Sequence, residues 1–244
     1  MKIEVCAYTL ESCLAAHRAG ADRVELCAGL FEGGTTPPAG MIAMARAALP
    51  VGLHVMIRPR GGDFLYTDLE FELMKEETRR ARASRVDGIV LGLLLADGRV
   101  DEARTRQLVD EAAPLPVTFH RAIDMTRDLD EALEAIISTG CTRVLTSGGK
   151  NNVDEGLPVL QRLVRLAAGR VEIMAGGGVN ATNVARLARA GVDAVHLSGK
   201  SERDSRMLFR NPSVSMGGIP GLPEYACYFC DAGKIEAVIR AARE

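Results

Sequence analysis

Short runs rich in β-branched and other apolar residues alternate with amphipathic stretches along the whole 244-residue chain. Eight of these runs have the length and composition of buried strands: residues 2–7, 23–28, 52–59, 88–94, 116–122, 143–149, 171–178 and 194–200. Between them, apolar residues recur at helical spacing. Eight β-then-α units without a break in composition predict an α/β fold, a single (β/α)8 TIM-barrel domain over residues 1–244. A doubly wound open sheet is the alternative, and it usually has fewer strands.

Glycines mark the ends of several predicted helices. The segments "AGADRV" (19–24), "TGCTRV" (139–144) and "AGVDAV" (190–195) each combine a closing Gly, a short polar turn and the start of a strand. The irregular part is 199–232, a long Gly- and Pro-rich connection between strand 8 and a last helix predicted at 233–243. Connections of this length are usually functional covers or assembly surfaces.

Charge and composition exclude several classes of partner. The net charge of −2 gives no electrostatic footprint for nucleic acid or for an anionic membrane surface. No apolar run approaches the roughly 18–20 residues of a membrane-spanning helix, and the start of the chain lacks the apolar core of a secretory signal. We therefore expect a cytoplasmic protein that binds neither nucleic acid nor membranes, with its six cysteines present as reduced thiols.

In a TIM barrel the chemistry lies at the carboxyl ends of the strands, and alternate side chains of each strand point inward. This alternation places Cys6, Cys27, Arg58, His120 and Ser198 at the mouth of the predicted barrel. Four further polar residues share the inward phase but are expected deeper: Glu4, Glu25, His54 and His196. Because barrel interiors are normally filled by branched apolar residues, this polarity indicates a functional mouth.

The strand end "VTFHRAID" (117–124) carries candidate catalytic residues. His120 is a candidate acid or base, Arg121 a candidate anion ligand, and Asp124 a group that orients either of them. Arg58 in "MIRPRGGDF" (56–64) and Glu25 on strand 2 complete this candidate set. The alternatives are a buried core histidine beside a surface ion pair, and a structural capped turn around Arg58.

Two glycine-containing turns form a candidate anion site. Gly176, Gly177 and Gly178 follow strand 7 and precede a predicted helix start at Asn180, and Ser198 with Gly199 follows strand 8. Backbone N–H groups in such turns can approach a phosphate, and the loops after strands 7 and 8 are the usual phosphate cradle of this fold. A purely structural tight turn is the alternative.

The repeated motif "IEVCA" and "VELCA" places Cys6 and Cys27 in the same phase on neighbouring strands. Two inward thiols at equivalent heights, with the carboxylates of Glu4 and Glu25 one layer below, would suit a soft ion such as Cu(I). Cysteine is also a good small core residue. The pair Cys227 and Cys230 lacks the second ligand pair of a structural zinc site, so we interpret it as two thiols in a connecting segment.

Several longer motifs, taken together, resemble the CutC copper-homeostasis family: "EVCAYTLESCLAAHRAGADRVELCAGLFEGGTTPPAG", "HVMIRPRGGDFLYTDLEFELM", "VTFHRAIDMTRD", "RVLTSGG" and "IMAGGGV". The resemblance implies a TIM barrel, a cytoplasmic location, a homodimer or higher homo-oligomer, and Cu(I) bound by cysteines, which match Cys6 and Cys27. Two departures are Pro38, where the family resemblance leads us to expect Ser, and Gly199, where it leads us to expect Ala.

Two functional hypotheses follow. The first is a copper-homeostasis protein that binds Cu(I) through thiolates at the barrel mouth. The second is an enzyme acting on a small phosphorylated or carboxylated metabolite, with the copper role indirect. In that case Gly176–Gly178 and Ser198 would hold the anion, Arg58 a second polar group, and His120 or Glu25 would move a proton.

Overall fold

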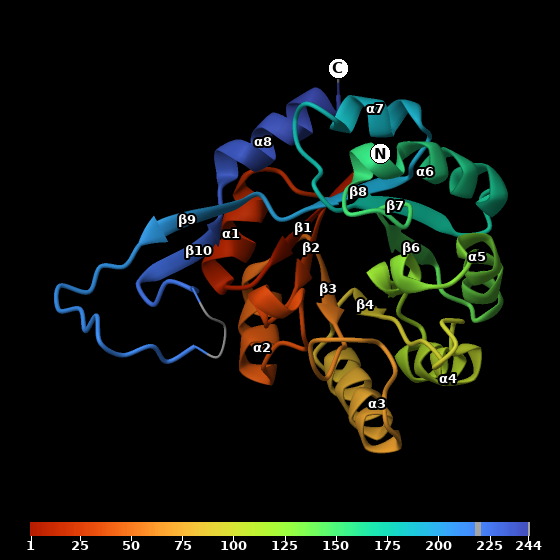
Figure 1. The fold of residues 1–244 in the computed structure, drawn as a ribbon, viewed down its shortest axis with the longest axis horizontal. Helices are drawn as coiled ribbons and strands as arrows, with labels where there is room; N and C mark the ends of the chain where they lie inside the picture. The colour runs from red at the N-terminus through yellow and green to blue at the C-terminus, as the bar shows by residue number, and fades with distance from the viewer. Residues whose placement is uncertain (218–220, 244) are drawn as a thin grey trace.

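The computed structural model describes residues 1–217 and 221–243. Eight parallel strands form a closed barrel in sequence order, with the last strand paired to the first, which confirms the predicted TIM barrel (Figure 1). The strands are β1 (Lys2–Ala7), β2 (Arg23–Leu26), β3 (Gly52–Met56), β4 (Gly88–Leu91), β5 (Val117–Phe119), β6 (Arg143–Thr146), β7 (Glu172–Gly176) and β8 (Ala194–Leu197). All except β1 end earlier than the sequence pattern suggests, because their last apolar residues belong to the βα loops.

Eight helices surround the strands (Figure 1). They are α1 (Leu10–Arg18), α2 (Ala39–Ala48), α3 (Asp68–Ala83), α4 (Glu102–Ala112), α5 (Leu129–Ser138), α6 (Val153–Ala167), α7 (Val184–Arg189) and α8 (Ala232–Ala241). Side-chain caps begin several of them; α3 has a complete capping box, in which Thr67 and Glu70 accept each other's backbone N–H. The outward side chains of the strands pack against these helices and form the continuous apolar core.

The barrel interior, in contrast, carries a layer of buried charge. The parallel register sets Glu4 beside Arg23 of β2 and beside His196 of β8. The Glu4 carboxylate is fully buried; it forms an ion pair with Arg23 and accepts a hydrogen bond of 2.8 Å from Nδ1 of His196. Arg143 of β6 donates to Glu172 of β7 at 2.7 Å. Polar pairing thus fills the lower interior where branched apolar side chains are usual.

The segment between β8 and α8 is less irregular than the sequence pattern predicts. Strands β9 (Lys200–Asp204) and β10 (Ala226–Cys230) pair antiparallel and project from one side of the barrel, beside α1 (Figure 1). We call residues 200–230 the arm; residues 218–220 lie outside the described part of the chain. The aromatic residues of "ACYFC" favour a strand, and Tyr228 packs edge-on against Phe31 at 5.3 Å between ring centroids.

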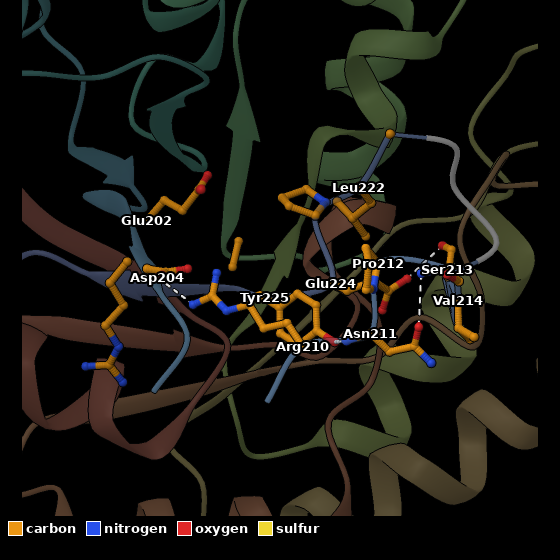
Figure 2. A pocket seen from close by; sticks show the side chains of 15 residues that line it. Glu202, Asp204, Arg210, Asn211, Pro212, Ser213, Val214, Leu222, Glu224 and Tyr225 are labelled. Carbon is orange, nitrogen blue, oxygen red and sulfur yellow. Dashed lines mark hydrogen bonds and ion pairs between the residues drawn. The ribbon is translucent and has the colours of Figure 1, made fainter. Parts of the chain in front are cut away.

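The outer part of the arm is held by its own hydrogen bonds around a cleft of about 700 Å³ (Figure 2). Arg210 pairs with Asp204 at 2.5 Å, and the Tyr225 hydroxyl accepts the Asn211 N–H at 2.7 Å. The Glu224 carboxylate accepts the Met216 N–H at 2.7 Å. The described part of the chain contains no helix that is both long and apolar enough to cross a membrane.

Candidate functional site

A small cavity of about 100 Å³ lies at the carboxyl ends of the barrel strands. Five of the residues predicted from the sequence line it: Cys6, Glu25, Arg58, His120 and Arg121. The remaining lining residues are Tyr8, Gly33, Met56, Phe64, Leu145 and His196. The strand phase therefore brings most of the candidate residues into one place, which we call the mouth cavity.

The two predicted thiols lie together at the edge of this cavity. The Sγ atoms of Cys6 and Cys27 are 3.8 Å apart, and both side chains pack in one buried cluster with Met56 and Val90. The register pairs Cys6 with Glu25, so the expectation of a carboxylate layer below both thiols is wrong for Glu25. Cys27 directly follows Leu26, the last residue of β2, and is fully buried.

His196 joins this group, although the sequence pattern placed it deeper. Cys6, Glu25 and His196 each offer a ligand atom, and these atoms lie within 4.8 Å of one another. Because Nδ1 of His196 bonds Glu4, its Nε2 lies toward the group, 3.7 Å from Glu25. A carboxylate on the second ring nitrogen is the usual support for a metal-binding histidine.

The two thiols of this cluster differ in pKa. A hydrogen bond from Cys27, together with one from His196, lowers the pKa of Cys6 well below the usual value. Burial and the neighbouring Cys6 raise the pKa of Cys27 well above it. Burial and the charge of Cys6 likewise raise the pKa of the Glu25 carboxyl. The cluster therefore favours ionisation of Cys6 over that of Cys27 and Glu25.

Arg58 joins two loops beneath the mouth. Its guanidinium donates to the carbonyl oxygens of Glu32, Gly34 and Gly62 at 2.7–2.8 Å. Its Nε has no hydrogen-bond partner among the described residues, although only 5% of the residue is exposed. The ring of Phe64 lies over the guanidinium, 4.9 Å from its centre. The predicted alternative, a capped turn, accounts for the three carbonyls but not for the unpaired Nε.

His120 follows β5, two strands along the barrel from β3, and is also buried. Its Nδ1 accepts the backbone N–H of Ala122 at 3.2 Å. Burial, helped by the charge of Arg58, lowers the pKa of His120 to about 3. The ring is therefore neutral at physiological pH and carries its proton on Nε2, which has no partner among the described residues. In this state His120 is a hydrogen-bond donor, and its role as an acid or base stays a prediction.

Arg121 and Asp124 have separate roles. The Asp124 carboxylate accepts hydrogen bonds from the Thr146 hydroxyl and from the N–H groups of Ser147 and Gly149 at 2.5–3.1 Å. It also accepts Nε of Arg121 at 2.8 Å. Asp124 does not line the mouth cavity. It fixes the loop after β6 and orients Arg121, as the orienting role predicted for it requires.

The predicted anion site divides into two places. Gly176 packs closely against neighbouring barrel side chains, because an added Cβ would lie 2.5 Å from Leu145. Gly177 and Gly178 have positive φ and form the turn that leads to α7. Ser198 and Gly199 instead line a separate cleft of about 570 Å³ with Lys200 and Lys234, which the glycine triplet does not line. Gly199 has a φ of +53°, a conformation that favours Gly over the expected Ala.

The remaining cysteines lie apart from the mouth cavity. Cys227 is exposed and Cys230 is buried, three positions apart on β10, and the Cys230 thiol donates to the Cys6 carbonyl at 3.4 Å. Burial raises the pKa of Cys13 to about 12 and that of Cys141 to about 11, so both are unreactive core thiols.

Six mouth residues are absent from the predicted site: Tyr8, Gly33, Met56, Phe64, Leu145 and His196. The sequence predicts that His196 points inward but lies deeper, whereas Met56 and Leu145 lie on strands, where the same alternation could have identified them. Tyr8 and Phe64 lie in βα loops, where alternation gives no direction.

Comparison with known proteins supports one family. Residues 1–201 match the model of the CutC family. A CutC protein of Chromobacterium violaceum is 48% identical over 98% of this chain and 97% of its own length. The human copper homeostasis protein cutC homolog is 45% identical over 99% of this chain and 89% of its own length. The crystal structure of CutC from Streptococcus agalactiae has a TM-score of 0.78 at 36% identity, covering 81% of this chain and 98% of that one. The chain belongs to the CutC family.

Proposed function

We propose that this protein serves copper homeostasis in the cytoplasm and binds Cu(I) at the barrel mouth through Cys6 and Cys27. The observation that carries the proposal is the 3.8 Å separation of the two sulfur atoms. Thiolate and thioether groups are the ligands that select Cu(I), and Met56 packs in the same cluster. Relatives that match nearly the whole chain bear copper-homeostasis names.

The surroundings of the thiols suit a cation of low charge. Cys6 lines the mouth cavity, so an ion from solvent reaches this sulfur first. Cys27 lies behind it and binds as the second thiolate after losing its proton. Metal binding at such a pair therefore releases a proton. His196, held by Glu4, lies within reach of the same ion.

An anaerobic Cu(I) titration of the reduced protein tests this proposal. We expect the Cys27→Ser variant to bind Cu(I) at least tenfold more weakly, because one of two soft ligands is replaced by a hard hydroxyl; even outer-shell changes cost about 10–100-fold in metal affinity. Cys13→Ser is the matched control, since Cys13 is equally buried but lies outside the cluster of Cys6, Cys27, Met56 and Val90. Equal affinities in Cys27→Ser and the unmodified protein would show that the pair is not the site.

We also propose that the chain forms a homodimer through the arm. Its outer segment exposes Met207, Leu208, Phe209 and Met216, and a contiguous exposed apolar surface marks an interaction site. A second copy is the proposed occupant, because the arm also carries the exposed opposite charges of Glu202 and Arg206, which can pair reciprocally in an isologous contact.

Sedimentation velocity measures this association directly. We expect a dimer for the unmodified protein and a monomer for the double variant Leu208→Ser, Phe209→Ser, because the exposed apolar area of the arm is removed. Leu69→Ser is the control, since Leu69 is an 83% exposed leucine on α3, outside the arm. A monomeric unmodified protein at micromolar concentration would refute the proposal.

A further inference from the structure

Arg58 is a buried cation without an acidic partner. None of the described Asp or Glu side chains lies within ion-pair distance of its guanidinium; its hydrogen bonds go to three neutral carbonyl groups. The other buried arginines of the barrel differ, since Arg23 pairs with Glu4 and Arg143 with Glu172. A buried charge without a counter-charge is unfavourable. Arg58 therefore has no carboxylate partner among the described residues.

Two more hydrogen-bond donors border the same cavity without protein acceptors. Nε2 of His120 is unpartnered and the residue is 4% exposed. Arg121 uses Nε and Nη2 for Asp124, Ser147 and the carbonyl of Lys150, which leaves Nη1 free among the described residues. A cavity bordered by two arginines and a neutral histidine donor is complementary to an acceptor that carries negative charge.

The size of the cavity limits the ligand. A buried water needs roughly 10–15 Å³ of such volume, so about 100 Å³ accommodates a ligand of several heavy atoms. The centroid of the Phe64 ring lies 4.9 Å from the Arg58 guanidinium and 5.0 Å from the His120 imidazole. Phe64 therefore supplies an apolar wall beside the two buried donors.

We propose that the mouth cavity binds the carboxylate or phosphate group of a small molecule between Arg58 and Arg121, with His120 as a further donor. The site goes beyond Cu(I) binding, since neither arginine is a metal ligand. Of the turns predicted as the anion site, Ser198 and Gly199 line another cleft, whereas Gly177 adjoins Arg121, because an added Cβ there would lie 3.5 Å from its guanidinium. Cys6 and Glu25 line the same cavity, so the rest of the bound molecule lies beside the thiols.

The first experiment measures binding to metal-free reduced protein by thermal shift and calorimetry. The probes are oxalate, pyruvate and inorganic phosphate, each against sodium chloride of equal ionic strength. We expect at least one probe to raise the melting temperature saturably. Oxalate or pyruvate acting alone identifies a carboxylate site, and phosphate acting alone identifies a phosphate site. No effect beyond that of sodium chloride overturns the proposal.

Variants locate the site. We expect Arg121→Gln to raise the Kd of the active probe by at least tenfold, because a charge-assisted hydrogen bond contributes about 1.5–3 kcal/mol, equivalent to roughly 10–150-fold. Arg60→Gln is the matched control, because Arg60 lies two residues after Arg58 but pairs with Glu70 and Asp63. An equal loss in Arg60→Gln, or no loss in Arg121→Gln, overturns the assignment.

The test also separates this site from the copper site. Arg58→Gln is a second variant that tests the site. It removes the hydrogen bonds to three loop carbonyls, so its folding is checked by circular dichroism. In the Cys27→Ser variant we expect weak Cu(I) binding together with unchanged probe binding, because Cys27 does not line the cavity. Loss of probe binding in Cys27→Ser contradicts an independent anion site.

Discussion

Replacing Glu4 by Gln is expected to lower the free energy of unfolding by about 3–5 kcal/mol, the usual effect of breaking a buried ion pair from one side. The carboxylate is fully buried and is shared by Arg23, His196 and, at 3.8 Å, His54. Gln keeps the shape but removes the charge, which leaves Arg23 buried without a counter-ion. Urea unfolding of both proteins at pH 7 measures the difference.

The control for this prediction is Glu134→Gln, which breaks a bidentate pair with Arg170 whose side chains are 49% and 45% exposed. A surface pair of this kind contributes about 0–1 kcal/mol. Although burial opposes ionisation of Glu4, the hydrogen bond from His196 and the charge of Arg23 hold its pKa well below the usual range. Its contribution is therefore present above the unfolded-state pKa of about 4.3 and decreases as the pH falls. Equal losses in the two variants at pH 7 would contradict the role of the buried pair.

Gly156→Ala is expected to destabilise the protein by at least about 3 kcal/mol, at the upper end of the overpacking range. Gly156 lies in α6, where an added Cβ would come within 1.7 Å of the Ser147 carbonyl oxygen. The Cβ is bonded to the backbone and the carbonyl oxygen is part of it, so no side-chain rotation can separate the two atoms. The helix must move off the loop after β6, which holds Asp124. Thermal unfolding measures the loss, and binding of the anion probe reports the consequent displacement of Arg121.

The comparison for Gly156→Ala is Gly40→Ala in α2. An added Cβ at Gly40 meets no atom within 4 Å, and Ala favours helices over Gly. We expect this variant to be as stable as the unmodified protein or slightly more stable. A Gly156→Ala protein that melts at the same temperature as Gly40→Ala would show that α6 and the β6 loop separate without cost.

The barrel itself could be predicted from the sequence because each strand is a short β-branched run and each helix is amphipathic. The same alternation of inward and outward positions correctly brought Cys6, Arg58 and His120 to one mouth. The pairing of β9 with β10 could not be predicted, because Gly and Pro residues surround both strands and the two strands are too short and too exposed to show a clear alternation.

The details of the site depended on information that a single sequence pattern does not contain. The offset between β1 and β2 decides that Cys6 lies beside Glu25, and strand registers are set by turn geometry and packing. The protonation state of His120 follows from its burial and from the nearness of Arg58, a residue 62 positions away in the numbering. The glycines after strands 7 and 8 correctly predicted turns with positive φ, but the sequence did not show which cavity each turn lines.

The charged layer inside the barrel has a thermal consequence. Exposure of apolar surface on unfolding raises the heat capacity, whereas exposure of polar surface lowers it. Five polar side chains of the interior are buried, so exposing them on unfolding lowers the heat-capacity increment: Glu4, Arg23, His54, Thr118 and Arg143. Compared with a barrel of the same length and an aliphatic interior, this protein has a smaller heat-capacity increment of unfolding. Its stability therefore changes more gradually with temperature on both sides of its maximum.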